Sequence, residues 1–422
     1  MSEWKFLTLK EAELEFIDGD RGVNYPKKSE LLPEGDCVFL NTGNVRQNSF
    51  DFSNLDFITK EKDNLLRNGK LQRDDIVLTT RGTVGNVALY SQEVPFSNIR
   101  INSGMVIIRV NKNFWHPYFI YLFFQSHLFK KQISRLISGS AQPQLPISIL
   151  ETVNIPQLTL DEQKEIIFNI KSIDQKIALN NQINQELEAM AKTLYDYWFV
   201  QFDFPDQNGN PYKSSGGKMV YHPELKREIP ERWGVEKLEN IANITMGQSP
   251  KGTSYNEVGE GMLFFQGSTD FGWRFPVARQ YTTEPSRIAE EDDILLSVRA
   301  PVGTLNIADT RCCIGRGLAA INSKVGANSY IFNVMQDFKK LFDMMNSVGT
   351  TFGSITKDDL YSLKLIYPPN ELLMKFDKSV NSFDREIKNR SRQNQELSQL
   401  RDWLLPMLMN GQVRVEDKTW KL

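Results

Sequence analysis

The chain has 422 residues, of which 40% are hydrophobic and 24% are charged, and its formal net charge is −2. This length is more than one small hydrophobic core can serve, and it predicts two or more domains. The longest strongly apolar run, residues 119–124, is too short to cross a bilayer, and the first residues lack the apolar stretch of a signal peptide. The near-neutral charge does not indicate a nucleic-acid binder, so such a role must depend on where individual Arg and Lys residues lie.

Cysteine and histidine are few and scattered. Cys37 stands alone and Cys312 is next to Cys313, which is neither a disulfide framework nor the spacing of metal ligands. The three histidines have no cysteine near them in the sequence, and we interpret them as ordinary structural or surface residues. This usage favours a reducing cytoplasm and predicts no metal site.

The first segment, residues 1–158, has the pattern of a mixed α/β domain. Short apolar runs at 75–79 and 104–108 predict strands, and an aromatic-rich stretch at 117–137 predicts a helix. The Gly, Ser and Gln residues that follow, up to position 144, predict a loop.

A long amphipathic helix is predicted next, over residues 159–200. Thr159 followed by Glu162 is a capping-box pattern, which marks its start. Its apolar positions then advance by three and four residues, which keeps them on one face, and Asn180 and Asn184 interrupt them midway. The same steps return at 369–410, where Arg390 and Asn394 form the polar interruption.

Two such apolar seams in one chain can bury each other as a coiled coil, in which the polar residues fix the register at some cost in stability. A helix lying on a globular core would instead carry a wider apolar stripe. We therefore favour pairing of the two helices. About forty residues at about 1.5 Å each would make a rod roughly 60 Å long.

Between the helices lie a linker at 201–230, which carries four prolines and an Asn-Gly turn signal, and a second globular segment at 231–368. Asn370 is predicted to cap the second helix, and Pro406 is predicted to kink or end it near Leu405. A polar tail, residues 411–422, follows.

The second globular segment repeats the first. Residues 75–85 recur as 293–303, and both stretches contain Arg-x-x-Val-Gly. Residues 41–44 resemble 266–269, and 138–140 resemble 348–350. The offset falls from 229 residues near the segment starts to 210 at the helices, so the first segment is longer by 19 residues. Two related domains on a rigid spacer would suit recognition of two different targets a fixed distance apart.

No catalytic motif is visible in the sequence. The stretch 214–219 faintly resembles a phosphate loop, but it lacks the earlier glycine, the following Ser or Thr, and a strand leading into a helix. The acid pairs Asp74-Asp75 and Asp292-Asp293 precede strands and are interpreted as turn residues. We therefore expect a chain that is not an enzyme by itself and binds no cofactor.

The remaining candidates for a functional site are polar and basic residues in predicted loops that also contain glycine. Glycine lets the backbone approach a partner closely, Arg, Asn and Gln can bind guanine and adenine edges, and hydroxyl groups can reach phosphates. The candidate DNA-binding residues are Asn44, Arg81, Thr83, Asn86, Ser138, Ser140, Gln142 and Gln144 in the first segment, and Gln248, Ser249, Lys251, Ser268, Thr269, Arg299, Arg316, Thr351 and Ser354 in the second. For any single residue, an ordinary surface loop explains the pattern equally well. Arg81 and Arg299 are stronger candidates than the others, because the Arg-x-x-Val-Gly motif that contains them is repeated.

The order of globular segment, helix, linker, globular segment and helix resembles the specificity subunit of type I restriction-modification systems. The resemblance covers nearly the whole chain and is most specific in the linker, from Phe204 to Met219 and on through Leu225 to Pro230. It also includes 233–238 and the Asn-Gln-Glu-Leu segments of both helices.

The resemblance implies an α/β (α+β) fold with a pseudo-two-fold internal repeat, in which two target-recognition domains alternate with two helices paired as an antiparallel coiled coil. Each domain would read one half of a bipartite double-stranded DNA site. Two methyltransferase subunits and the motor-endonuclease subunits would join this framework, and S-adenosylmethionine, ATP and Mg²⁺ would belong to them. Aromatic residues at the helix ends are candidates for docking these partners: Tyr195, Tyr197, Trp198, Phe199 and Trp403. Packing against the chain's own domains explains them equally well.

Two other function classes stay open at this point. One is a coiled-coil adaptor with two protein-binding domains, which a salt-sensitive DNA affinity would contradict. The other is an enzyme with an unrecognised nuclease site, which incubation of the chain with Mg²⁺ and DNA would reveal.

Overall fold

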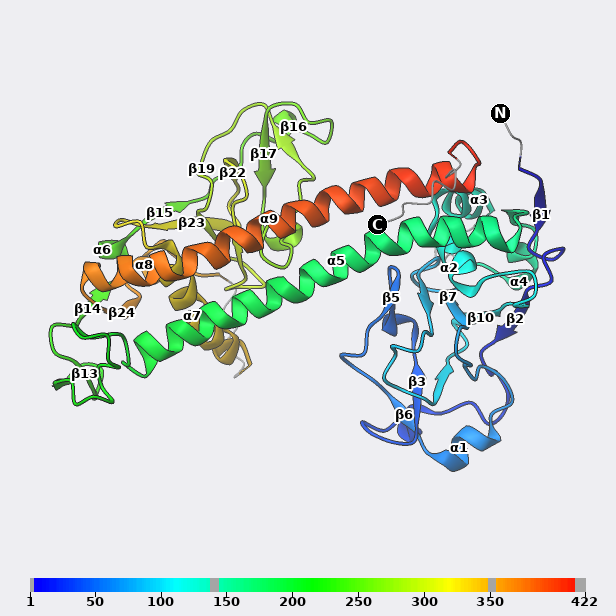
Figure 1. The fold of residues 1–422 in the computed structure, drawn as a ribbon, viewed down its shortest axis with the longest axis horizontal. Helices are drawn as coiled ribbons and strands as arrows, with labels where there is room; N and C mark the ends of the chain where they lie inside the picture. Colours follow the sequence, from blue (N-terminus) through cyan, green and yellow to red (C-terminus); the bar gives the residue numbers. More distant parts are fainter. Residues whose placement is uncertain (1–3, 137–143, 348–353, 414–422) are drawn as a thin grey trace. The chain divides into compact units, whose positions relative to one another are not determined.

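The computed structural model describes residues 4–136, 144–347 and 354–413. The chain divides into two units, each with its own share of the two long helices (Figure 1). Unit 1 comprises residues 1–177 and 395–422, and unit 2 comprises residues 178–394. Within the described ranges, no helix is both long and apolar enough to cross a membrane.

The globular part of unit 1 is built on an antiparallel sheet of four strands in the order β2-β10-β7-β8. A three-stranded sheet, β6-β3-β9, and a pair, β1-β11, complete it, together with a short β4-β5 hairpin. The elements are β1 (Phe6–Thr8), β2 (Glu15–Asp18), β3 (Cys37–Leu40), β4 (Val45–Arg46), β5 (Ser49–Phe50), β6 (Phe57–Ile58), α1 (Lys60–Leu65), β7 (Ile76–Thr79), β8 (Val87–Leu89), β9 (Ile99–Ile101), β10 (Met105–Arg109), α2 (Pro117–Gln125), α3 (His127–Leu136), α4 (Ile147–Leu150) and β11 (Asn154–Pro156).

The single helix expected over 117–137 is wrong, because two helices occupy this stretch. Ser126 separates α2 from α3 in an extended conformation. Its hydroxyl donates to the Phe123 carbonyl (2.6 Å) and accepts from the Phe129 amide (3.2 Å), so a side chain replaces helical backbone bonds on both sides of the break. The break turns Phe124 and Phe129 toward each other, with ring centroids 4.7 Å apart.

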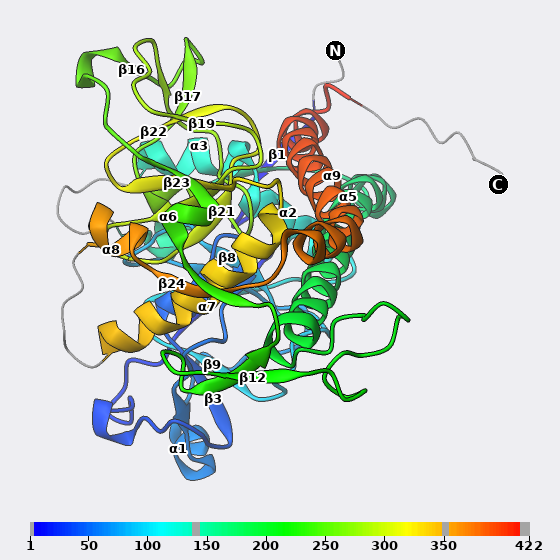
Figure 2. The same cartoon turned by 90° about the vertical axis from the view of Figure 1, so that its left-hand side faces the viewer.

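Unit 2 repeats this plan, with a four-stranded antiparallel sheet in the order β15-β23-β20-β21 and a five-stranded sheet, β16-β18-β17-β22-β19. Figure 2 faces this unit and shows α7 beside β24, where the Tyr330 hydroxyl donates to the Ile366 carbonyl. The elements are β12 (Met219–His222), β13 (Arg227–Pro230), β14 (Gly234–Lys237), α6 (Leu238–Ile241), β15 (Ala242–Met246), β16 (Tyr255–Asn256), β17 (Met262–Phe265), β18 (Tyr281–Thr282), β19 (Ile288–Ala289), β20 (Ile294–Ser297), β21 (Leu305–Ile307), β22 (Cys312–Ile314), β23 (Leu318–Ser323), α7 (Asn328–Ser347), α8 (Lys357–Tyr361) and β24 (Lys364–Tyr367).

The sheet order confirms the internal repeat. The strand predicted at 75–79 is β7, and its repeat is β20; each lies second from one edge of its four-stranded sheet. The acid pairs are turn residues, as predicted: Asp74 and Asp292 have positive φ values of 76° and 69°. The following acids, Asp75 and Asp293, are buried and accept backbone amides three residues back. Burial raises the pKa of Asp293 above its ordinary value.

The long helices are α5 (Leu160–Tyr195), which continues as a π-helical turn (Asp196–Val200), and α9 (Asn370–Met409). The capping box at the start of α5 is confirmed, because the Thr159 amide and hydroxyl both donate to the Glu162 carboxylate at 2.9 Å. Asn370 is already the first helical residue of α9, so the predicted cap lies one position too late.

Of the two outcomes expected at Pro406, a kink or an end near Leu405, the end does not occur. The helix runs on to Met409, and the Asn410 amide still donates to the Pro406 carbonyl at 3.0 Å. Leu405, Leu408 and Met409 are all buried in the core of unit 1. Their burial offsets the roughly 3 kcal/mol that an interior proline costs a helix.

The two helices pair antiparallel inside each unit. In unit 1, Asp174 of α5 accepts from Arg401 of α9 (3.2 Å). In unit 2, Asn180 donates to Asn394 (2.9 Å), whereas Asn184, further along α5, donates to Ser391, which is earlier in α9 (3.3 Å). The predicted polar interruptions of the two seams therefore bond to each other.

Replacing Asn180 by Leu should destabilise unit 2 by about 1–3 kcal/mol, because its partners would stay buried without hydrogen bonds. Asn180 is fully buried, and besides Asn394 it bonds Gln393 (2.7 Å) and Arg390 (3.1 Å). Urea unfolding followed by circular dichroism measures the loss. Gln182→Leu, at an exposed position of the same helix, is the control, and equal midpoints for the two variants would contradict the role of the polar seam.

The linker at 201–230 is more ordered than its composition suggests. Asp203 accepts the amide and the hydroxyl of Ser214, both at 2.7 Å. Phe204 stacks on Tyr212 and Trp233, with ring centroids 4.6 and 5.2 Å apart. The last part of the linker forms the β12-β13 hairpin. Of the stretch 214–219, residues 214–218 precede β12 and Met219 is its first residue.

Candidate nucleic-acid interface

The repeated Arg-x-x-Val-Gly segments each form a turn that is closed by the same backbone hydrogen bond in both units. In each, the amide of the glycine donates to the carbonyl of the last residue of the preceding strand, at 3.0 Å for Gly85 and 2.9 Å for Gly303. Both glycines have positive φ values, 98° and 87°, which side chains rarely adopt. The valine before each glycine packs into the hydrophobic core. The motif is thus a turn that places its arginine at equivalent positions, after β7 in unit 1 and after β20 in unit 2.

Arg81 and Arg299 are exposed, and each forms an isolated bridge, Arg81 with Gln144 just before α4 and Arg299 with Ser354 just before α8. In the parts of the chain that the structure describes, no carboxylate forms an ion pair with either arginine. The same is true of Arg316. These three guanidinium groups therefore keep their hydrogen-bond donors available for an incoming ligand.

In unit 1, the Arg81 turn lies against two other loops. The Gly104 carbonyl accepts the Arg81 amide (3.1 Å). A Cβ atom on Gly104 would come within 2.7 Å of the Thr42 methyl group, so a side chain at this position would displace the Thr42 side chain. A small hollow of about 160 Å³ lies beside the turn; it is lined by Asp18, Arg21, Thr80, Arg81, Gln144, Leu145, Pro146 and Ile147.

The two asparagine candidates of unit 1 hold loops in place. Asn44 is 4% exposed, and its amide donates to the carbonyls of Asp51 (3.1 Å) and Asn54 (2.7 Å). Asn86 donates to the Val45 carbonyl (2.9 Å). Asn44 uses both N–H groups of its amide in these bonds and would have to give one up to donate to a base, whereas Asn86 keeps its second N–H group and the exposed Thr83 side chain needs no change. Ser138, Ser140 and Gln142 lie outside the described residues.

In unit 2, three candidates come together from two segments. The Ser249 hydroxyl accepts the Arg316 amide (3.3 Å), and the Gln248 amide donates to the Ile314 carbonyl (3.0 Å). A Cβ atom on Gly247 would lie 2.1 Å from the Gly315 carbonyl, which explains the glycines at this crossing. Gln248, Ser249 and Arg316 thus share one rim.

The other candidates of unit 2 surround this rim less closely. Ser268 and Thr269 lie in a 3₁₀ turn after β17, and Lys251 is 3.8 Å from Glu284 in a highly exposed ion pair. Thr351 lies outside the described residues. The structure adds Gln266, which bonds the Ser249 hydroxyl at 2.9–3.0 Å. Its signal was the likeness of 41–44 to 266–269; Arg21, beside the unit 1 hollow, had no comparable signal.

Three of the five aromatic docking candidates are buried in the core of unit 2: Tyr195, Trp198 and Phe199. They surround Phe376 of α9, with ring centroids 6.3, 5.7 and 4.9 Å from it. Burial raises the pKa of Tyr195 well above its ordinary value. Tyr197 and Trp403 are 37% and 56% exposed, so the docking hypothesis narrows to these two.

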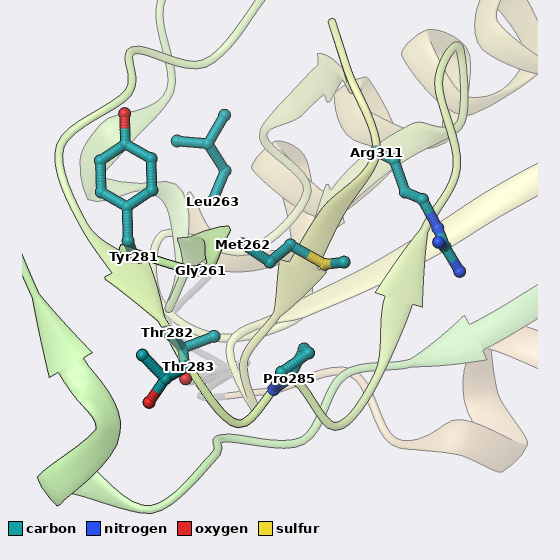
Figure 3. A pocket seen from close by; sticks show the side chains of 8 residues that line it. All are labelled: Gly261, Met262, Leu263, Tyr281, Thr282, Thr283, Pro285 and Arg311. Carbon is teal, nitrogen blue, oxygen red and sulfur yellow. The ribbon is translucent and has the colours of Figure 1, made fainter. Parts of the chain in front are cut away.

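An open hollow of about 510 Å³ lies elsewhere in unit 2, along β17 and β18. Figure 3 shows the side chains that line it. Met262, Tyr281 and Thr283 line it, and Arg311 is the charged residue at its rim. Arg311 pairs with Glu290 at 3.1 Å. The lining of this hollow contains no pair of side chains suited to acid–base catalysis. Across the described ranges, no group of three or more His, Cys, Asp or Glu residues is arranged to hold a metal ion.

Comparisons with known proteins agree with this architecture. The family model of the type I restriction modification DNA specificity domain matches residues 1–189 and 230–399. A protein of Methanocaldococcus jannaschii assigned as the MjaX type I restriction enzyme specificity subunit is 30% identical over 88% of this chain and 86% of its own length. The HindI specificity subunit of Haemophilus influenzae is 21% identical over 98% of this chain and all of its own length.

The crystal structure of the type I restriction-modification S subunit from M. genitalium covers 96% of both chains, with a TM-score of 0.56 and 16% identity. This likeness shows that the fold is shared. The family model covers most of the chain and matches both repeats. The chain therefore belongs to the family of type I restriction-modification DNA specificity subunits.

Proposed function

We propose that the chain reads a bipartite DNA site in the cytoplasm, one half with each globular part. The observation that carries this proposal is the recurrence, in both units, of a turn with an exposed arginine to which the described residues offer no ion-pair partner. Arginine can bind guanine O6 and N7 with two parallel hydrogen bonds, and such contacts discriminate between bases. Because the surrounding loops differ between the units, each turn faces a different set of side chains and reads a different half-site.

We also propose that the helices dock two methyltransferase subunits, and that motor-endonuclease subunits join this complex for restriction. Tyr197 and Trp403 support the first part, since large exposed aromatic side chains are common in protein interfaces. Adenine methylation and DNA cleavage would then be carried out by the partners, with their S-adenosylmethionine, ATP and Mg²⁺. This chain would select the DNA site and would supply no reacting group.

Mapping of methylated adenines at single-molecule resolution tests the proposal, in cells that co-express this chain with its methyltransferase subunit. We expect one motif made of two defined segments with unspecified bases between them. Cells that express the methyltransferase subunit alone are the control. A continuous motif, or the same motif without this chain, would contradict the proposal.

Arg81→Ala and Arg299→Ala should each weaken recognition of a different half-site, by about 1–3 kcal/mol if each arginine binds a base with two hydrogen bonds. Competition binding of the complex to duplexes with changes in one half measures this loss. Arg311→Ala, which removes an exposed arginine paired with Glu290, is the control. A loss that is uniform across sequences, with a smaller salt dependence, would instead assign the two arginines to phosphate contacts.

A further inference from the structure

One arginine of unit 2 is buried under the globular part, against the helix pair. Arg274 is 6% exposed and lies in the tight loop 271–276. The Asn306 side chain bonds the Gly272 backbone twice, at 3.0 and 3.2 Å, and the Ile307 amide donates to the Arg274 carbonyl (2.8 Å). A Cβ atom on Gly272 would lie 2.5 Å from the Phe275 carbonyl. The loop is thus fixed to the edge strand β21, and the position of Arg274 is fixed with it.

The Arg274 guanidinium group joins three helices. It donates to Glu188 of α5 (3.2 Å) and to Asp384 of α9 (2.5 Å). Its carbon lies 4.5 Å from the ring centroid of Phe332 in α7. Planar geometry and several donors let an arginine hold two carboxylates and an aromatic face at once.

Asp384 belongs to a charged stripe on α9. Lys388 and Arg392 follow at four-residue steps, which places all three on one face of the helix. Lys388 pairs with Glu291 (2.7 Å) and with Asp292 (2.5 Å). Arg392 pairs with Asp309 (3.0 Å). We name Arg274, Asp384, Lys388 and Arg392 the charged clamp. It joins one face of α9 to three loop segments of the globular part, at residues 271–276, 291–292 and 309.

The first repeat lacks this clamp. At the 210-residue offset, Asp384 corresponds to Asp174, but Lys388 and Arg392 correspond to Ala178 and Gln182. Asp174 instead accepts from the Tyr118 hydroxyl (3.1 Å) and from Arg401 of α9 (3.2 Å). The two globular parts are therefore attached to their helices by different chemistry, although their sheets share one order.

We propose that Arg274 is a positioning residue for recognition of the second half-site, acting with Lys388 and Arg392. It holds the globular part of unit 2 in one orientation on α5 and α9, and so aims the Arg299 turn at its bases. Without the charge of Arg274, Glu188 and Asp384 face each other under the loop, and the globular part gains freedom to turn. This inference rests on the proposed function. It adds to that function the residues that set the orientation of the second DNA-reading part.

The test uses the purified complex with its methyltransferase subunit and duplexes that carry the mapped target. Methylation rates are compared for the intact target, for changes in either half, and for spacers one base pair longer or shorter. Arg274→Met keeps the apolar stem and removes the charge, Arg274→Lys restores the charge without the planar group, and Arg311→Met is the matched control.

For Arg274→Met we expect discrimination within the second half-site to fall about tenfold or more, because a buried charge pair loses one partner. Relative methylation of the altered spacers should rise, and discrimination within the first half-site should stay unchanged. Arg274→Lys should recover part of the loss. The proposal is overturned if Arg274→Met behaves as Arg311→Met does, or if both half-sites lose discrimination equally.

If Arg274→Met does not assemble, Lys388→Met and Arg392→Met decide the question by the same readouts, since both remove clamp pairs at the edge of the contact. Wild-type complex that shows no bipartite target would contradict the proposed function. Wild-type complex with a bipartite target, and clamp variants equal to the control, would contradict this inference alone.

Discussion

Exchanging residues 1–157 for the corresponding segment of another family member should change one half of the DNA target and leave the other half unchanged. The reason is that unit 1 has its own core, its own four-stranded sheet and its own Arg81 turn. The readout is the map of methylated adenines in cells that express the chimaera with the methyltransferase subunit. The expected map keeps one segment of the original motif and replaces the other.

The structure shows which contacts the donor segment must preserve. Gln163 of α5 is fully buried and bonds the His116 amide (2.8 Å) and the Phe114 carbonyl (2.9 Å). Tyr118 bonds Asp174. A donor segment that offers Gln163 and Asp174 the same partners, at positions 114, 116 and 118, should assemble normally on α5. A second donor segment is the control for a chimaera that fails to assemble for another reason. A chimaera that methylates a site changed in both halves would contradict independent reading by the two units.

Phe376→Ala should lower the free energy of unfolding of unit 2 by about 3–5 kcal/mol, because it removes a buried ring from a tightly packed core. Phe376 is fully buried at the centre of the cluster formed by Tyr195, Trp198 and Phe199. Its removal leaves a cavity where α9 meets the end of α5. Trp198 and Trp233 lie in the same cluster, so urea unfolding followed by tryptophan fluorescence reports the change.

Met374→Ala is the matched control, since Met374 lies two residues away on α9 and is 48% exposed. We expect it to change stability by no more than about 0.5 kcal/mol. Hydrogen exchange of the α7 amides gives a second probe, because Tyr330 contacts Phe199 with ring centroids 4.9 Å apart. Equal transitions for the two variants would show that the aromatic cluster does not hold the helix ends.

The large features of the fold could be predicted because they leave periodic or repeated signals. The two long helices followed from steps of three and four residues, and the equivalent sheets followed from the recurrence of 75–85 as 293–303. The helix does not end near Leu405, because the burial of Leu405, Leu408 and Met409 outweighs the local effect of Pro406, and propensity alone does not show that burial. Likewise, the break at Ser126 depends on one hydroxyl that replaces backbone bonds, and apolar spacing carries no sign of it.

The candidate interface could be predicted only where sequence repetition marks a shared backbone turn. Arg81 and Arg299 were found in this way. Asn44 resembles a base-reading residue in the sequence, but its amide is bonded inside its own loop, which depends on carbonyls seven and ten residues away. The buried Arg274 had no signal at all, because its partners are on helices 86 and 110 residues away in the chain.

The composition of unit 1 also sets an order of events during synthesis. Its core combines Leu9 and Ile155 from the start of the chain with Leu405 and Leu408 from the end. Unit 2 is continuous, so all of its residues are present before the last helix turn of unit 1 has been made. At about 5–20 residues per second, the roughly 220 residues between the two parts of unit 1 occupy the ribosome for about 10–40 seconds. Unit 1 is therefore begun before unit 2 and completed after it. The apolar surface of its first part stays uncovered until the final turns of α9 have been synthesised.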